Sequence, residues 1–399
     1  MTNPQSPWVL PAGIDEVLPQ QAAHLEQLRG QALNIFDQWG YDLVLPPMVE
    51  FLDTLLVGTG ADLELDTLKV TDGLSGRLLG VRADMTPQIA RMDAHSLPEQ
   101  AERRLCYVGT VIRGAGDALG GSRAPIQLGG ELFGADCASG DHEILDLLLA
   151  LLDGLEVGST VLDLGHVGVF RALADKANLS TSQIDQTRDA IARKAIPELD
   201  AQLSQWGVAD AERQALLTLC RLHGPVEQVI ARAKQAFAGL LDVQGEAALA
   251  RLEQVAGLLQ AQHANRHRIL VDLSQLQGYH YHTGLVFAGY LPCLGRALVR
   301  GGRYDNIGDA FGRARPAIGF SLDLRDISAF APEHIAKSVP VYAPAKPDDA
   351  ALRQAVTELR AQGRRVISIH NPQEQVHGAR LVQCGDEHKW QLVEDKNDG

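Results

Sequence analysis

Apolar side chains follow a helical repeat near the start of the chain and shorter, strand-like runs after it. Over residues 20–39 they recur every three or four positions, as on one face of a helix. A second, more apolar helix is expected from residue 139 or 141 through about residue 152. The runs typical of strands lie at residues 41–45, 68–71, 77–82, 104–113, 126–133, 160–165, 268–273 and 285–288. The second and third of these runs predict a hairpin around Asp72-Gly73. The pattern predicts a protein that mixes strands and helices.

Two changes in this pattern divide the chain. Residues 175–262 have a helical pattern rich in Ala, Leu, Gln and charge, which predicts a helical insertion without visible chemistry. Residues 331–338 have the character of a linker. The tail beyond them predicts a strand, a helix, a strand and a hairpin, which make a small α/β unit. We therefore expect a core over residues 1–330 that contains the insertion, and a C-terminal domain over residues 339–399.

Three local signals make narrower predictions. Thr86 is typical of a helix N-cap and Pro87 of the first helical turn, so a short helix is expected to begin there. A further helix is expected from Ser321. Residues 300–305 predict a strand that ends in a tight glycine turn.

Tyrosine and histidine alternate within residues 276–284, between two predicted strands. In an extended chain this spacing places Tyr279 and Tyr281 on one face and His280 and His282 on the other. The stretch is then either a core strand or the floor of a small-molecule pocket, and the pattern alone does not separate the two. A metal site is a third interpretation. Two histidines without a carboxylate or cysteine at motif spacing do not define one, so no metal is expected.

The predicted strand over residues 126–133 carries two polar side chains, Gln127 and Glu131. On an edge strand they would face solvent. The apolar side chains around them, at positions 126, 128, 132 and 133, favour instead the ligand-binding face of an antiparallel sheet.

Composition narrows the class of protein. The 399 residues are 45% hydrophobic, as in globular proteins, and acidic residues exceed basic ones by 50 − 36 = 14. This charge disfavours a chain whose main task is to bind a nucleic-acid backbone. The five cysteines lack zinc or redox spacing, no signal sequence is recognisable, and the apolar window at residues 144–157 is interrupted by Asp146 and Asp153. These features predict a cytoplasmic protein.

Six segments, in the expected order over roughly residues 8–328, resemble the catalytic fold of histidine-tRNA synthetases. The resemblance implies an α+β fold of the class II synthetase type, in which helices flank an antiparallel sheet, with a helical insertion and a small C-terminal α/β unit. The segments are Pro46-Pro47, where the dimer-forming first motif ends; residues 82–86, similar to Arg-Pro-Glu-Gly-Thr; residues 111–113, with the second-motif arginine; residues 127–134, similar to a histidine-pocket strand; residues 278–284, similar to Gly-Leu-Asp-Tyr-Tyr; and residues 301–305, Gly-Gly-Arg-Tyr-Asp.

The resemblance also implies a pocket for free histidine. Asp84 and Thr86 would hold the α-ammonium group, and Asp84 is a shorter equivalent of the family's glutamate. Arg113 and Gln127 would face the carboxylate. Glu131 would accept a hydrogen bond from the imidazole ring. The full set of expected histidine-binding residues is Asp84, Thr86, Arg113, Gln127, Glu131, Gln277, Tyr281, His282, Arg303 and Tyr304.

The half of the site that would bind ATP departs from the synthetase pattern. Ala115 stands where the second motif has a glutamate. Asp326 stands where the third motif has its adenine-stacking arginine, and Gln277 replaces the arginine that stabilises charge during histidine activation. Adenylate formation depends on positive groups that neutralise phosphates. These replacements therefore predict no aminoacylation and no catalytic residues.

A fold that keeps a histidine pocket without ATP chemistry resembles the regulatory subunit of ATP phosphoribosyltransferase, a synthetase paralogue. That resemblance implies a non-enzymatic chain that joins a short-form catalytic subunit at the first step of histidine biosynthesis and relays allosteric feedback inhibition by histidine. It also implies a class II-type dimer. No cofactor, nucleic acid or membrane is expected as a partner. The alternatives are a divergent, active histidine-tRNA ligase and an aminoacyl-tRNA-sensing or stress-signalling module.

Overall fold

The computed structural model describes residues 8–58, 61–115, 121–276, 278–279, 281–333, 339–371, 379–384 and 389–393. Contacts divide the chain into a large unit, Met1–Glu333, and a small unit, His334–Gly399. Each unit has a hydrophobic core of its own.

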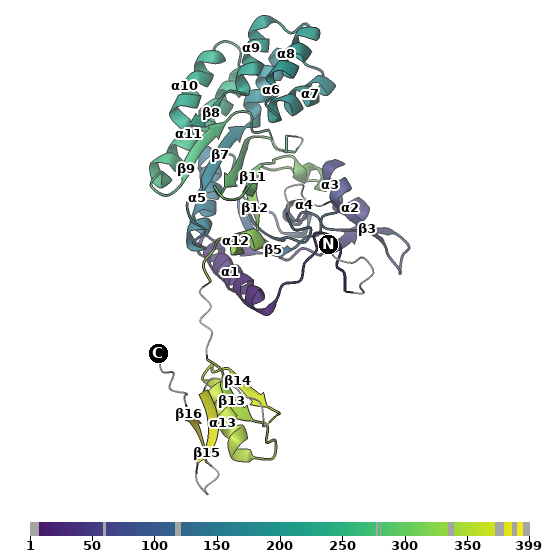
Figure 1. The fold of residues 1–399 in the computed structure, drawn as a ribbon. Helices are drawn as coiled ribbons and strands as arrows, with labels where there is room; N and C mark the ends of the chain where they lie inside the picture. The colour runs from purple at the N-terminus through teal and green to yellow at the C-terminus, as the bar shows by residue number, and fades with distance from the viewer. Residues whose placement is uncertain are drawn as a thin grey trace. The chain divides into compact units, whose positions relative to one another are not determined.

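The described residues of the large unit form a nine-stranded sheet (Figure 1). Its central strands run antiparallel, whereas β1 pairs with β5 and β7 pairs with β9 in parallel. The predicted α+β class is confirmed. In sheet order the strands are β1 (Asp42–Leu43), β5 (Arg103–Thr110), β6 (Ile126–Phe133), β12 (Ala317–Asp323), β11 (Ala297–Arg303), β10 (Leu285–Tyr290), β7 (Val161–His166), β9 (Arg268–Asp272) and β8 (His223–Pro225).

Helices cover one face of this sheet. The two predicted helices are present as α1 (Pro19–Gln38) and α5 (Ala138–Gly154), and they pack on each other and, with α12 (Leu324–Ser328), on β6 and β12. Phe36 of α1 is fully buried and stacks on Phe320 of β12, with 6.3 Å between ring centroids. Burial of such aromatic pairs is the main favourable term in packing helices on a sheet.

Successive side chains of strand β6 point alternately to the two faces of the sheet. Leu128 and Leu132 belong to the core beneath the helices, whereas Gln127 and Glu131 line a cavity on the opposite face. Because β6 lies between β5 and β12, the solvent-facing edge strand considered for these polar residues is wrong.

Short elements border this second face. They include a three-stranded sheet in the order β2-β4-β3, of which the β3–β4 pair is the hairpin expected from the sequence. A separate core cluster containing Met85, Ile89 and Tyr107 packs between the short helices and the sheet. The elements are β2 (Val49–Phe51), α2 (Leu52–Leu55), α3 (Ala61–Asp66), β3 (Leu68–Thr71), β4 (Leu78–Val81), α4 (Thr86–Arg91), a π-helix η1 (Met92–Ser96) and a 3-10 helix η2 (Ile307–Phe311).

The predicted helical insertion is present as an arm at the β7–β9 end of the sheet (Figure 1). It is not wholly helical, because strand β8 lies within it and pairs with β9. Helix α6 joins the arm to the sheet, since it follows β7 directly and packs on α9 and α11. The helices are α6 (Val167–Lys176), α7 (Thr181–Ala192), α8 (Ile196–Gln205), α9 (Asp210–Leu219), α10 (Val226–Ala236) and α11 (Val243–His263).

The small unit has the predicted order of strand, helix, strand and hairpin. Its described strands form a sheet in the order β14-β13-β15-β16, against which α13 packs. Asp349 caps α13 by accepting a hydrogen bond from the Leu352 N–H at 2.9 Å. The elements are β13 (Val341–Pro344), α13 (Ala350–Ala361), β14 (Val366–Ile369), β15 (Ala379–Cys384) and β16 (Lys389–Val393).

Several local predictions were wrong at element ends. Strand β1 is shorter than expected. The helix expected from Ser321 begins only at Leu324, because β12 continues to Asp323, whose carboxylate accepts from the Arg325 N–H at 2.9 Å and caps α12. Thr86 is the first residue of α4 and not its side-chain cap. Across the described residues, no helix has both the length and the apolar content that a membrane span requires.

Candidate functional site

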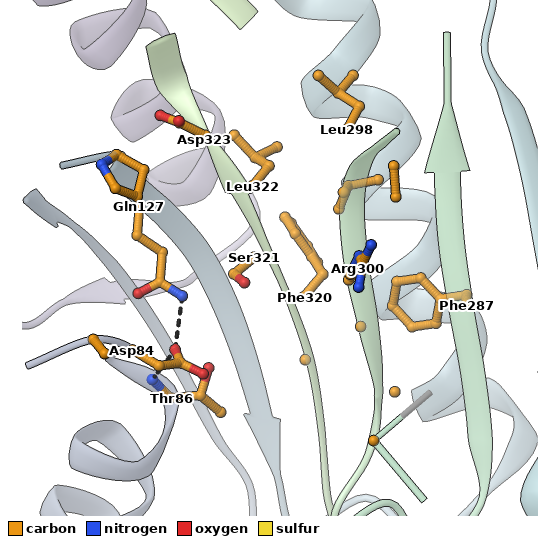
Figure 2. A pocket seen from close by; sticks show the side chains of 18 of the residues that line it. Asp84, Thr86, Gln127, Phe287, Leu298, Arg300, Phe320, Ser321, Leu322 and Asp323 are labelled. Carbon is orange, nitrogen blue, oxygen red and sulfur yellow. Dashed lines mark hydrogen bonds between the residues drawn. The ribbon is translucent and has the colours of Figure 1, made fainter. Parts of the chain in front are cut away.

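A cavity of about 610 Å³ opens on the face of the sheet opposite α1 and α5 (Figure 2). Its floor is formed by residues of β6, β10, β11 and β12, and the turn before α4 forms one wall. Of the ten expected binding residues, those that line it are Asp84, Thr86, Arg113, Gln127, Glu131, Tyr281, His282 and Tyr304. Residues that are up to 220 positions apart in the chain are therefore brought together. Gln277 and His280 lie outside the described residues.

Asp84 is held rigidly at one wall of the cavity (Figure 2). Its Oδ1 accepts hydrogen bonds from Gln127 Nε2 at 2.7 Å and from the Thr86 N–H at 3.0 Å. Gln127 is itself fixed, because its Oε1 accepts from the Met85 N–H at 2.8 Å. Asp84 Oδ2 accepts no hydrogen bond from a described residue. This oxygen can therefore accept from a cationic donor in the cavity.

Glu131 is the most deeply buried acid of the cavity, with 1% of its surface exposed. Tyr107 donates to its Oε1 at 3.0 Å and Tyr304 donates to its Oε2 at 2.6 Å. Burial raises the pKa of Glu131 to about 8, and the two tyrosine hydroxyls oppose part of that rise. Glu131 can thus present either a carboxylate or a neutral acid to a ligand near neutral pH.

Glycines on neighbouring strands make room for these side chains. Gly319 of β12 lies directly across from Glu131, and a Cβ at position 319 would overlap the Glu131 carboxylate. A Cβ at Gly302 would lie 2.8 Å from His282 Nε2. The glycine turn expected at residues 300–305 is therefore wrong: Gly301 and Gly302 lie within β11 and pair with strands on both sides. Close approach of side chains, and not chain reversal, requires glycine here.

The stretch of alternating rings is a turn and not an extended strand. Gly278 has φ +67°, and its carbonyl accepts from the N–H groups of Tyr281 and His282 at 3.0 and 2.8 Å. This turn separates Tyr279 from Tyr281, which an extended chain would have placed on one face. The Tyr281 and His282 rings lie together at the cavity, 4.2 Å apart, whereas Tyr279 packs edge-on against Phe170.

Arg303 does not line the cavity. Its guanidinium is buried behind the wall, where it donates to Asp141 Oδ1 at 2.6 and 3.1 Å, to Asp305 Oδ1 at 3.1 Å and to the Ala135 carbonyl at 2.9 Å. Four of its five N–H donors are therefore used within the protein, and its side chain is 3% exposed. Its structural role is to fix β11 to the start of α5.

The other end of the cavity carries charges of both signs. Arg296 donates to Asp326 at 2.6 Å, and both side chains line the cavity. The backbone N–H of Ala115 donates to Asp66, which also lines it. Arg113 is a further cation in the lining of the cavity. Among the described residues, no group of three His, Cys, Asp or Glu side chains is arranged to hold a metal ion.

Two residues that support the site were not predicted from the sequence. Tyr107 lies in the apolar run of β5, where the sequence predicts a core residue. Its hydroxyl nevertheless forms hydrogen bonds with Glu131 and Thr86. Arg171 of α6 donates to backbone carbonyls of the turn. Neither carries a motif signal, because each acts on residues far away in the chain.

Comparison with known proteins identifies the family. A family model described as histidyl-tRNA synthetase matches residues 13–327, and one described as ATP phosphoribosyltransferase subunit HisZ C-terminal domain matches residues 338–393. An ATP phosphoribosyltransferase regulatory subunit of Thioalkalivibrio sulfidiphilus is 48% identical over 90% of this chain and 90% of its own length. One of Chromohalobacter salexigens is 46% identical over 96% of this chain and 98% of its own length.

The chain belongs to the family of ATP phosphoribosyltransferase regulatory subunits. It is a regulatory subunit in histidine biosynthesis and a non-catalytic paralogue of histidyl-tRNA synthetase, as predicted. This assignment sets aside the alternative of an active ligase.

Solved structures of this family and of synthetases share the fold. An ATP phosphoribosyltransferase regulatory subunit/histidyl-tRNA synthetase from Bacillus halodurans superposes with a TM-score of 0.80 at 27% identity, over 93% of this chain and 95% of that chain. Histidyl-tRNA synthetase from Nostoc, at 18% identity and a TM-score of 0.76 over 98% of this chain and 97% of that chain, shares the fold alone. The class II-like architecture predicted from the six segments is confirmed.

The glycine at position 319 should be essential to the cavity. In Gly319→Ala the new methyl group overlaps Glu131, and either the acid or β12 must shift. Such overpacking should lower the free energy of unfolding by at least about 2 kcal/mol, as measured by urea denaturation. Gly295→Ala is the control, because a Cβ there meets no atom within 4 Å, and it should change stability by less than about 0.5 kcal/mol. Equal behaviour of the two variants would contradict the packing argument.

Burial of Glu131 should make stability depend on pH. Its pKa is about 8 in the folded chain against an ordinary value of 4.5, so the folded state holds the proton more tightly. The free energy of unfolding should therefore fall as pH rises from 4.5 to 8. Glu131→Gln does not titrate and should gain about 2–5 kcal/mol relative to the wild type between pH 5 and 8.5 in denaturation curves. Glu26→Gln, on the exposed face of α1, should follow the wild-type curve; a parallel curve for Glu131→Gln would refute the assignment.

Proposed function

We propose that this regulatory subunit binds free histidine in the cavity on the sheet and, in a cytoplasmic complex with the short-form catalytic subunit of ATP phosphoribosyltransferase, relays histidine as the feedback inhibitor. The observation that supports the proposal is that two acids, Asp84 and Glu131, line the same cavity. Asp84 has an oxygen free to accept, and Glu131 is buried between two hydroxyl donors.

The three polar groups of histidine match three groups of this cavity. The ammonium group fits Asp84 Oδ2, since a carboxylate is the strongest acceptor for a cationic donor. The carboxylate fits Arg113, which lines the cavity and has no described ion-pair partner. The imidazole fits Glu131, next to His282 and Tyr304. Thr86 and Tyr281 complete the wall, and Gln127 acts through Asp84.

Histidine is also chemically suited to an acid with a pKa near 8. The bare ring nitrogen of a neutral imidazole and a protonated Glu131 would share one proton in their hydrogen bond, and either partner can hold it. A purely apolar ring would form no hydrogen bond with Glu131 and would lose this contribution to binding. The site should therefore discriminate against amino acids whose side chains lack a ring nitrogen.

The far end of the cavity supports regulation and not adenylation. A synthetase needs uncompensated cations for the phosphates of ATP. Here Arg296 is neutralised by Asp326, and Asp66 and Asp323 add further negative charge to the lining.

A dimer of this chain fits an apolar surface at the first motif. Leu43, Leu45, Met48 and Val49 are all exposed next to Pro46-Pro47, and Leu45 is 68% exposed. A cluster of large exposed side chains in a short edge segment is typical of an interaction surface. We infer that this surface, called here the first-motif surface, joins two copies of the chain about a two-fold axis.

Removal of the charge at Asp84 should weaken histidine binding. Asp84→Asn keeps the acceptor for Gln127 and loses one charge-assisted hydrogen bond of about 1.5–3 kcal/mol, so Kd should rise about 10- to 100-fold by calorimetry. In the complex with the catalytic subunit, the histidine concentration for half-inhibition should rise by a similar factor. Asp53→Asn, at an exposed position, is the control. If wild-type chain, free and in complex, takes up no histidine, the proposed effector is wrong.

A charge on the first-motif surface should separate the dimer. Leu45→Glu places a carboxylate in the proposed contact, where it would be buried without a partner. Sedimentation analysis should show a dimer for the wild type and a monomer for the variant at micromolar concentration. Val243→Glu, at another exposed apolar position, should remain a dimer. A dimeric Leu45→Glu variant would exclude this surface.

A further inference from the structure

Arg171 of α6 contacts the backbone of the turn that lines the cavity. Its guanidinium donates to the carbonyl of His282 at 2.7 Å, to that of Tyr279 at 3.3 Å and to that of Thr283 at 3.4 Å. Three carbonyls of one short segment thus converge on a single side chain. Arginine suits this role because its planar group offers several donors in a fixed geometry.

The same guanidinium also packs on the turn's outer aromatic ring. Its central carbon lies 4.9 Å from the centre of the Tyr279 ring, a cation–π distance, and Tyr279 in turn packs edge-on against Phe170, the residue before Arg171. Among the described residues, no carboxylate forms an ion pair with Arg171. Its charge is therefore directed at carbonyl oxygens and one ring, all of which belong to the turn.

A second connection ties the end of the turn to the arm. Thr283 donates to Asp305 at 2.6 Å, and Asp305 accepts from Arg303. Arg303 pairs with Asp141, which also pairs with Arg251 of α11 at 2.5 Å. The turn that presents His282 to the cavity is thus joined to α6 directly and to α11 through a buried chain of ion pairs.

We propose that Arg171 is a positioning residue for histidine recognition and couples occupancy of the cavity to the helical arm. By holding the three carbonyls on the far side of the turn, it orients Tyr281 and His282 toward the cavity. Because α6 also packs on α9 and α11, ordering of the turn by a ligand restrains the base of the arm. The inference rests on the proposed binding of histidine in this cavity.

Substitution of Arg171 tests the coupling. Arg171→Met keeps the aliphatic stem and removes all hydrogen-bond donors. Arg171→Lys keeps the positive charge but has one donor nitrogen in place of three. We expect Kd for histidine, measured by calorimetry on the full chain, to rise at least tenfold in Arg171→Met and by a smaller factor in Arg171→Lys. Arg188→Ala, on α7, where the arginine pairs with Asp185 and Asp189 of the same helix, should leave the affinity and the activity of the complex unchanged.

Hydrogen exchange distinguishes coupling from general support of the fold. In the wild type, saturating histidine should slow amide exchange both in residues 278–284 and in α6. In Arg171→Met at saturating histidine, the turn should still be protected while the protection of α6 is lost. Equal protection of α6 in both proteins, or a Kd within twofold of the wild type, would overturn the inference alone. Failure of the wild type to bind histidine would overturn the proposed function as well.

Discussion

A carboxyl group buried on the open face of the sheet is the constraint on which the site depends. Glu131 is removed from water, and a buried acid is tolerated only when its oxygens are bonded. Tyr107 from β5 and Tyr304 from the end of β11 supply those bonds. Gly319 on β12 supplies the space. Four neighbouring strands must therefore keep one register for this single side chain to be accommodated, so the cavity and the sheet are parts of one structure.

The two ends of the cavity differ in the charged groups that line them. At the Asp84 and Glu131 end, polar groups are fixed by neighbours and retain free acceptor capacity. At the other end, Arg296 is paired with Asp326. The first arrangement favours recognition of a small polar ligand, and the second neutralises one of the cations that could meet a phosphate group. A fold shared with histidyl-tRNA synthetases thus serves in a regulatory subunit.

Regulation also requires that a binding site be connected to something that can respond. The turn that carries Tyr281 and His282 is held by Arg171 of α6 and by Asp305, which accepts from Thr283 and from Arg303 of β11. These contacts connect the proposed binding site to α6 and to the sheet. Coupling between sites of this kind is a free-energy difference between two arrangements, and it is carried by such discrete contacts.

Much of the fold followed from local pattern. The helix α1, the strand β6 and the hairpin β3–β4 lie where periodicity placed them, since the spacing of apolar residues directly reflects which side of an element is buried. Eight of the ten residues that the motif segments predicted line the cavity, and the family that these segments resemble is the one to which the chain belongs. What the sequence determined by itself was therefore the set of elements and the residue types available to the site.

Only the tertiary structure decided how those residues are used. Arg303 lies in a motif that predicts a pocket arginine. Asp141, 162 residues away, instead holds its guanidinium behind the wall of the cavity. Tyr279 and Tyr281 were expected on one face and are separated by a turn at Gly278. Tyr107 and Arg171 gained roles through partners 24 and 111 residues distant. Each outcome depends on contacts between distant segments, and no local spacing in the chain encodes which of the competing partners will be nearest after folding.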